Sequence, residues 1–200
     1  MSKGILISVI AGLFFGFFAA PDFLVDAAGM IINCALVFLV FTVGIDLGLQ
    51  DNLWQGIKHE GFGVFLLPVA IILGTMIFGT LTAVFLPYSI GEMMAVSGGL
   101  GWYSLVPAML MDYSAELSAV SFLHNVLREL SAVMLIPIVA QKIGWLETIS
   151  LPGSASMDVC LPVIEKSTGP KMAIYSFVSG AVLSLAIPFI VTAVMEIFLI

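Results

Sequence analysis

The chain has 200 residues, of which 61% are hydrophobic and only 10% charged, and its mean hydropathy is +1.19. Soluble domains are about 45–50% apolar and about 25% charged, so this composition excludes a soluble globular protein and indicates a chain surrounded by lipid. The formal net charge is -7, and the six Lys and Arg residues are scattered, which excludes a nucleic-acid-binding surface.

Long apolar segments predict membrane-spanning helices, because a helix needs roughly 20 largely apolar residues to cross the hydrocarbon core. No soluble linker or fixed-period repeat divides the chain, so residues 1–200 are expected to form a single transmembrane domain. The predicted fold class is an all-α integral membrane protein. The five segments that meet the length or come close to it are 4–20, 26–49, 61–86, 117–140 and 171–199.

Two further apolar stretches are interrupted. Glu92–Met111 contains the glycine-rich run Ser97-Gly-Gly-Leu-Gly101, and Ile149–Val163 is short and contains Pro152 and Gly153. Irregular backbone at membrane depth survives only where protein or a water-filled cavity satisfies its amides. Carriers build substrate sites from such discontinuous helices. The sequence therefore predicts about five transmembrane helices plus two broken or re-entrant segments, with a substrate path beside the latter.

The distribution of lysines predicts the orientation, because cytoplasmic loops carry an excess of basic residues. If neither broken segment crosses the membrane, all five lysines lie on one side and several acids on the other. If Glu92–Met111 does cross, the last three lysines lie outside the cell instead. We prefer the first arrangement, a multi-pass membrane protein with a cytoplasmic N-terminus and an outside C-terminus. The lysines are Lys3, Lys58, Lys142, Lys166 and Lys171, and the acids are Asp22, Asp26, Asp112 and Glu116.

The span 117–140 carries the strongest functional signal, since five polar residues recur at helical spacing on one face. An ionised residue near mid-membrane costs about 2.5–3.5 kcal/mol even on lenient scales, so such residues usually face an interior and mark pathways. The alternative is a structural ion pair with neighbouring helices. Two roles stay open for the histidine, either a buried side chain held by hydrogen bonds or a group that relays protons. The five residues are Ser121, His124, Asn125, Arg128 and Glu129.

Two other carboxylates have unusual surroundings. Asp158 lies in a run of small residues with hydroxyls such as Ser156, which can line a cavity in a broken element; the alternative is a loop Asp that caps a short helix. Asp46 is flanked by Gly44 and Gly48, which let a backbone or ligand come near. It could instead be an interfacial acid.

The glycine-rich run continues into Trp102, Tyr103 and Ser104. An aromatic face can hold an ammonium group by cation–π attraction, although the two rings could also form an interfacial belt. The three intramembrane acids, set against one arginine, leave a net charge of about -2, which favours a cation or a proton as the ligand and disfavours an anion.

Four motifs, in this order and spacing, match a known family. They are Val43-Gly-Ile-Asp-Leu-Gly48, Gly99-Leu-Gly-Trp-Tyr-Ser-Leu105, Asn125-Val-Leu-Arg-Glu129 and Ser154-Ala-Ser-Met-Asp-Val-Cys-Leu-Pro-Val163. On these motifs the chain resembles the lysine exporter family often called LysO, over essentially its whole length. This resemblance implies a multi-pass carrier of the cell inner (plasma) membrane that exports L-lysine in exchange for protons through intramembrane carboxylates. Carried over by motif, these are Glu129 and Asp158, and less directly Asp46.

One departure from the family concerns length. Typical members have a preceding three-span half, whereas this chain resembles the C-terminal five-span portion alone. The resemblance thus suggests either a separate small three-span partner subunit or a homodimer that does without the missing helices.

In the mechanism we expect, Asp158 and Glu129 hold the side-chain ammonium of lysine, with Asp46 or the aromatic pair contributing. Arg128, or the positive end of a broken helix, takes the α-carboxylate. Protons then compete for the carboxylates outside and release the lysine. No cofactor, metal or nucleic acid is expected.

Three alternatives belong to other classes. The chain could be a non-autonomous subunit of a two-component exporter, or a cation channel with an acidic constriction. An intramembrane hydrolase would use Ser156, His124 and Asp158, but the sequence has no G-x-S-x-G motif. We therefore expect a carrier and not an enzyme.

Overall fold

The computed structural model describes residues 63–199, together with single positions between Ile7 and Ile45. Within residues 63–199 the chain is helical and contains no β-strand. The predicted spans 4–20 and 26–49 fall where only single positions are described, so the total of five spans stays a prediction. The elements are α4 (Gly63–Leu81), η1 (Thr82–Val84), α5 (Ile90–Ser97), α6 (Leu105–Leu110), α7 (Ala115–Lys142), α8 (Trp145–Ser150), η2 (Gly153–Met157), α9 (Leu161–Thr168) and α10 (Pro170–Phe198).

Three of the described helices are long and apolar enough to cross a membrane: residues 64–84, α7 and α10. They confirm the predicted spans 61–86, 117–140 and 171–199 to within a few residues, and with them the all-α membrane class. Helix α7 is the least apolar, with a hydropathy of 1.5 against 2.4 and 2.2 for the other two. Its polar residues therefore have to face protein or water.

Serine caps fix where two of the helices begin. The Ser89 hydroxyl accepts a hydrogen bond from the Glu92 amide at 3.2 Å, and the Glu92 carboxylate accepts one from the Ser89 amide at 2.7 Å. This reciprocal capping box satisfies amides that have no partner within the first turn of α5. Ser114 caps α7 in a similar way, by accepting from the Leu117 amide.

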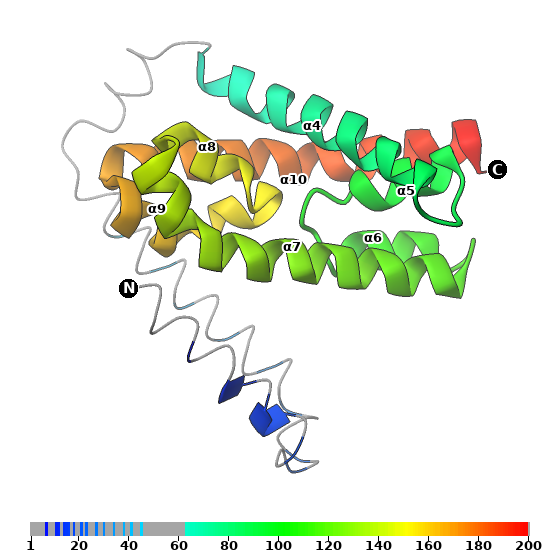
Figure 1. Ribbon diagram of the computed structural model, residues 1–200, viewed down its shortest axis with the longest axis horizontal. Coiled ribbons are helices and arrows are strands. Elements are labelled where there is room, and N and C mark those ends of the chain that lie inside the picture. The colour runs from blue at the N-terminus through cyan, green and yellow to red at the C-terminus, as the bar shows by residue number, and fades with distance from the viewer. Residues whose placement is uncertain are drawn as a thin grey trace.

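Each of the two interrupted segments folds back as a helical hairpin, as predicted. The first hairpin, α5 and α6, lies at the end of the bundle where α4 ends and α7 begins (Figure 1). The second hairpin, α8, η2 and α9, lies at the opposite end, where α7 ends and α10 begins. The connecting segments, here called the first tip (98–104) and the second tip (151–160), both reach the middle of the bundle.

Two clusters of buried apolar side chains pack these hairpins against the spans. One joins α4, α5, α6 and α10 and includes Leu100, Val106 and Ile187, which are fully buried. The other joins α7, α8 and α9 around Ile136 and Ile149. Each hairpin is thus packed into the protein, which is the condition for irregular backbone at membrane depth.

The lysines of residues 63–199 all lie at one end of the bundle, which also holds Glu147 and Glu165. Lys142 ends α7, Lys166 lies in the last turn of α9 and Lys171 lies in the first turn of α10, so all three are at one end. Asp112 and Glu116 lie at the other end, where α7 begins. This is the asymmetry expected if neither hairpin crosses. The assignment of the lysine end to the cytoplasm stays a prediction.

Candidate substrate cavity

A cavity of about 220 Å³ lies where the two tips face α7 and α10. The first tip and the second tip together supply most of its wall, and each of the two helices adds one side chain. Of the residues named from the sequence, Trp102, Tyr103, Ser104, Glu129 and Asp158 all line it. The full lining is Gly101, Trp102, Tyr103, Ser104, Glu129, Ser154, Ala155, Met157, Asp158, Val159 and Ser184.

The charge of this cavity comes from two carboxylates. Glu129 comes from the middle of α7 and Asp158 from the second tip, and none of the described lining residues is basic. The Asp158 carboxylate accepts a hydrogen bond from the Val159 amide at 2.6 Å. Burial raises the pKa of Asp158, which lies outside the three spans, although this hydrogen bond acts in the opposite direction.

The first tip contributes an aromatic wall. The Trp102 indole nitrogen donates to the Ser104 hydroxyl at 3.0 Å, which fixes the indole and leaves the Ser104 hydrogen free to donate. Tyr103 packs edge-on against Phe122 of α7, with ring centroids 6.3 Å apart. Burial raises the pKa of the Tyr103 hydroxyl, and the charges of Glu129 and Asp158 raise it further. The negative charge of the cavity thus favours the protonated, neutral form of Tyr103.

Arg128 does not line the cavity, although it neighbours Glu129 in the sequence. Its Nε donates to the Leu151 carbonyl at 2.9 Å and its Nη2 to the Ser150 carbonyl at 3.1 Å, where α8 ends. Both terminal nitrogens also lie 3.4 Å from the Thr75 hydroxyl of α4. Within residues 63–199 Arg128 has no carboxylate partner, so the alternative of a structural ion pair finds no support there.

Asn125 and Ser156 also lie beside the cavity and not in its wall. The Asn125 side chain accepts from the Gly101 amide at 2.8 Å and donates to the Ser121 carbonyl at 2.9 Å. Ser156 is fully buried and exchanges hydrogen bonds with Ser176 of α10, each hydroxyl donating to the other residue's carbonyl, at 3.0 and 2.6 Å. These contacts connect the tips to α7 and α10.

Two further residues considered from the sequence, Asp46 and His124, are likewise not among the described lining residues. Asp46 lies outside the described residues. The Nδ1 atom of His124 is buried, and no partner for it is present among the residues that the structure describes. Within the described part of the chain, no third His, Cys, Asp or Glu joins Glu129 and Asp158 in a cluster that could hold a metal ion.

The sequence alone did not bring out Met157 and Ser184 as lining residues. Ser184 is a hydroxyl inside the apolar helix α10, and it donates to the Met157 sulfur at 3.7 Å. A lone polar residue in an apolar span was an available signal. Nothing in the chain, however, shows which face of α10 meets the second tip.

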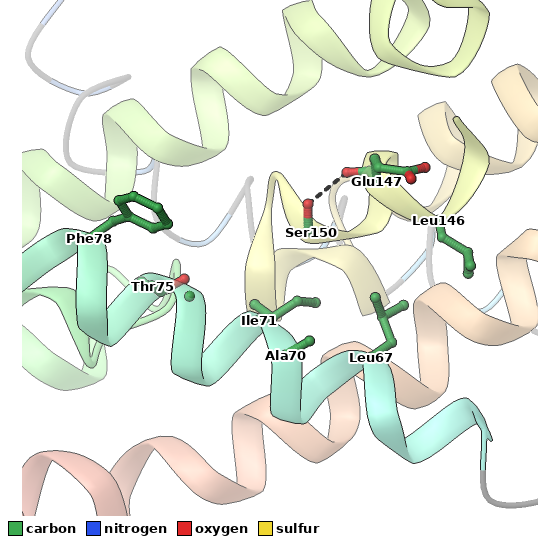
Figure 2. A pocket seen from close by; sticks show the side chains of 9 residues that line it. Leu67, Ala70, Ile71, Thr75, Phe78, Leu146, Glu147 and Ser150 are labelled. Carbon is green, nitrogen blue, oxygen red and sulfur yellow. Dashed lines mark hydrogen bonds between the residues drawn. The ribbon is translucent and has the colours of Figure 1, made fainter. Parts of the chain in front are cut away.

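A larger but shallower groove, of about 460 Å³, runs between α4 and α8 (Figure 2). Figure 2 shows Leu67, Ala70 and Ile71 along its α4 wall, and Ser150 donating back to the Glu147 carbonyl at 2.7 Å. Most of its lining is apolar. The small cavity concentrates the charge and the aromatic rings, so we take it as the candidate site in preference to the larger groove.

The chain has relatives among named proteins. It is 31% identical to the protein named "Lysine exporter LysO" of Escherichia coli strain K12 over 157 residues, which cover 78% of this chain and 52% of the relative. A protein of Haemophilus influenzae, whose name gives it provisionally as a lysine exporter, is 29% identical over 154 residues, or 76% of this chain and 78% of the relative. The chain therefore spans about half the length of the first. No solved structure matches.

The family profile described as "Lysine exporter LysO" matches residues 6–195. That range includes both hairpins, α4, α7, all but the last three residues of α10 and every residue that lines the cavity. The chain belongs to the LysO lysine exporter family.

Proposed function

We propose that this protein is a membrane carrier that exports L-lysine, or a similar cationic amino acid, through the cavity between the two tips. The observation that carries the proposal is that Glu129 and Asp158, which are far apart in the sequence, line one cavity with an aromatic wall. Two carboxylates without a basic residue in the described lining favour a cation, because each stabilises positive charge in poorly solvated surroundings.

Two of the three charged groups of lysine, the side-chain ammonium and the α-carboxylate, have complementary groups in the cavity. The side-chain ammonium lies between Glu129 and Asp158, and the face of Trp102 or Tyr103 adds cation–π attraction. The α-carboxylate needs hydrogen-bond donors, which the free hydrogens of Ser104 and other lining hydroxyls supply. This arrangement replaces Arg128 as the expected partner of the α-carboxylate, because the guanidinium already donates to the end of α8.

Export is coupled to protons that move in the opposite direction. The raised pKa of Asp158 means that its carboxylate takes up a proton in milder acid than an ordinary aspartate does. A proton and a lysine ammonium compete for the same carboxylate oxygens. Protonation from the side of the inner membrane that faces away from the cytoplasm therefore releases lysine. The protonated site then returns and deprotonates in the cytoplasm.

Efflux from proteoliposomes loaded with lysine tests the assignment. Glu129→Gln and Asp158→Asn each keep the shape of the side chain and remove its charge. A hydrogen bond to a charged group contributes about 1.5–3 kcal/mol, so each variant should slow efflux about tenfold or more. Asp112→Asn is the matched control, because Asp112 is an exposed acid in the turn before α7, and it should export at the wild-type rate.

Wild-type efflux in both carboxylate variants would reject the proposed site. Equilibrium binding of labelled lysine to the detergent-purified protein separates a binding defect from a transport defect. Unitary currents in electrical recordings would instead identify a channel, since a carrier turns over far too slowly to produce them.

A second candidate is that this protein exports lysine only together with a partner subunit. The match covers 52% of the Escherichia coli relative, so that relative contains a region with no counterpart in the aligned residues. Co-purification of a second, smaller membrane protein from the native host, and restoration of efflux when the two are reconstituted together, would establish this form. A homodimer active by itself would exclude it.

A further inference from the structure

The two tips touch through their backbones in the middle of the bundle. The Ser154 amide donates to the Leu100 carbonyl at 2.8 Å. Both peptides are shaped for a close approach: Leu100 has a φ of 47°, and Gly153 has a φ of 68°. A Cβ atom on Gly153 would collide with the Leu100 carbonyl. The contact therefore depends on backbone geometry that leaves no room for a side chain.

One turn of α7 holds both tips. Asn125 accepts from the Gly101 amide of the first tip, and Arg128 donates to the Ser150 and Leu151 carbonyls at the start of the second tip. Residues three apart lie on the same side of a helix, so the two side chains project together. Asn125 is itself fixed through its hydrogen bond to the Ser121 carbonyl.

The contact also lies between the two ends of the molecule. The hairpins come from opposite ends of the bundle, and their tips meet at its middle (Figure 1). The same segments line the cavity: Gly101 to Ser104 on one side and Ser154 to Val159 on the other. A bound amino acid therefore touches both halves of the junction.

The two tips are not held equally. The second tip is bonded to Arg128 and also to α10, through the paired hydrogen bonds of Ser156 and Ser176. Among the described residues, one side-chain hydrogen bond, from the Gly101 amide to Asn125, holds the backbone of the first tip to α7. The first tip is thus the one that can move with the fewest polar contacts broken.

We propose that the joined tips are the barrier of the transport cycle, and that Asn125 and Arg128 are positioning residues that hold it closed and not ligands of the substrate. Each export event moves the first tip and parts Leu100 from Ser154. This mechanism rests on the proposed function, since it presumes that the substrate occupies the cavity beside the tips.

Cross-linking the tips tests the proposal directly. Leu100→Cys and Ser154→Cys are combined in a chain whose native thiols are removed by Cys34→Ser and Cys160→Ala. The 2.8 Å backbone hydrogen bond brings the two residues within the range of Cα separations, about 4.4–6.8 Å, that a disulfide needs. Copper phenanthroline should form the disulfide and stop lysine efflux without changing lysine binding relative to the same double-cysteine protein kept reduced, and a reductant should restore efflux.

Two results would overturn the proposal that the joined tips are the barrier. One is a failure of the two cysteines to cross-link in the folded protein, and the other is full efflux through the cross-linked protein. Neither would affect the proposed function, which instead fails if the wild-type protein neither binds nor exports lysine. Each single-cysteine variant, oxidised in the same way, controls for effects of the reagent.

Variants of Asn125 provide a second test in the otherwise native chain. Asn125→Leu removes the acceptor for the Gly101 amide, whereas Asn125→Asp keeps an acceptor oxygen at that position. For a positioning role, Asn125→Leu should change the maximal rate of export and leave KM nearly unchanged, and Asn125→Asp should restore most of the wild-type rate. A rise in KM with an unchanged maximal rate would make Asn125 a substrate ligand and contradict the proposal.

Discussion

Arg128 and Glu129 are neighbours in the middle of the same helix, yet their surroundings differ. The arginine donates to carbonyl oxygens at the end of α8, so its charge is solvated by the protein. The glutamate faces a cavity with a second acid and several hydroxyls. One residue of rotation, about 100°, separates a structural face of α7 from a binding face. The identity of a charged residue in a membrane helix therefore says less about its role than its neighbours do.

The largest expected effect is on the stability of the protein, and it distinguishes the structural face of α7 from its binding face. Arg128→Met leaves the Ser150 and Leu151 carbonyls without their charged donor and should destabilise the protein by about 3 kcal/mol. Glu129→Gln removes a charge that is costly at membrane depth and should leave the stability unchanged or raise it. Thermal unfolding of the detergent-solubilised proteins measures both. Equal destabilisation by the two substitutions would remove the distinction between the faces.

A smaller effect is expected at the junction of the tips. Gly153→Ala forces a side chain into a backbone with a φ of 68° and against the Leu100 carbonyl. The left-handed conformation alone costs about 1–2 kcal/mol for an L-residue, and the collision adds to it. Gly74→Ala is the control for the substitution itself, because Gly74 lies within α4 and has open space around it. In thermal unfolding, Gly153→Ala should be the more destabilising of the two.

The binding face should also respond to pH. Since burial raises the pKa of Asp158, protons compete with lysine as the pH falls through that raised value, and lysine affinity should fall with it. Above this range the carboxylate is ionised and binding is strongest. Asp158→Asn should bind weakly and lose this part of the pH dependence, as measured by equilibrium binding of labelled lysine. An unchanged pH profile in the variant would assign the titration to another group.

The smallest effect is expected in the aromatic wall. Trp102→Phe keeps a ring at the cavity but removes the hydrogen bond to the Ser104 hydroxyl. A neutral hydrogen bond contributes about 0.5–1.5 kcal/mol, so the apparent KM for lysine export should rise about threefold. Trp102→Leu, which also removes the ring, should raise KM further. If the two variants behave alike, the ring itself contributes nothing to binding.

Much of the fold could be predicted from the sequence. The spans follow from apolar length, and the hairpins from glycine, proline and serine at positions where a continuous helix would otherwise be expected. Glu129 and Asp158 were recognisable as acids in apolar surroundings, and both line the cavity. These features are local, so a single chain reveals them.

The partners of each residue could not be predicted. Asn125, Arg128 and Ser156 share the sequence pattern of Glu129 and Asp158, and the sequence hypothesis grouped all five as binding residues. Their hydrogen bonds connect segments that are 20 to 24 residues apart, and only packing decides which segments meet. The contribution of Ser184 was hidden for the same reason, since its role depends on how α10 lies against the second tip.

The neutral partners of Arg128 have a consequence for charge movement. Because carbonyl groups solvate the guanidinium without cancelling its charge, the described centre carries one positive and two negative groups, and its net charge is -1. One lysine or one proton makes it neutral. Moving an uncompensated charge through a region of low dielectric is unfavourable, so the occupied forms would reorient more readily than the empty one. On the proposed function, this favours exchange of one lysine for one proton without net charge transfer, and it opposes leakage by the empty carrier.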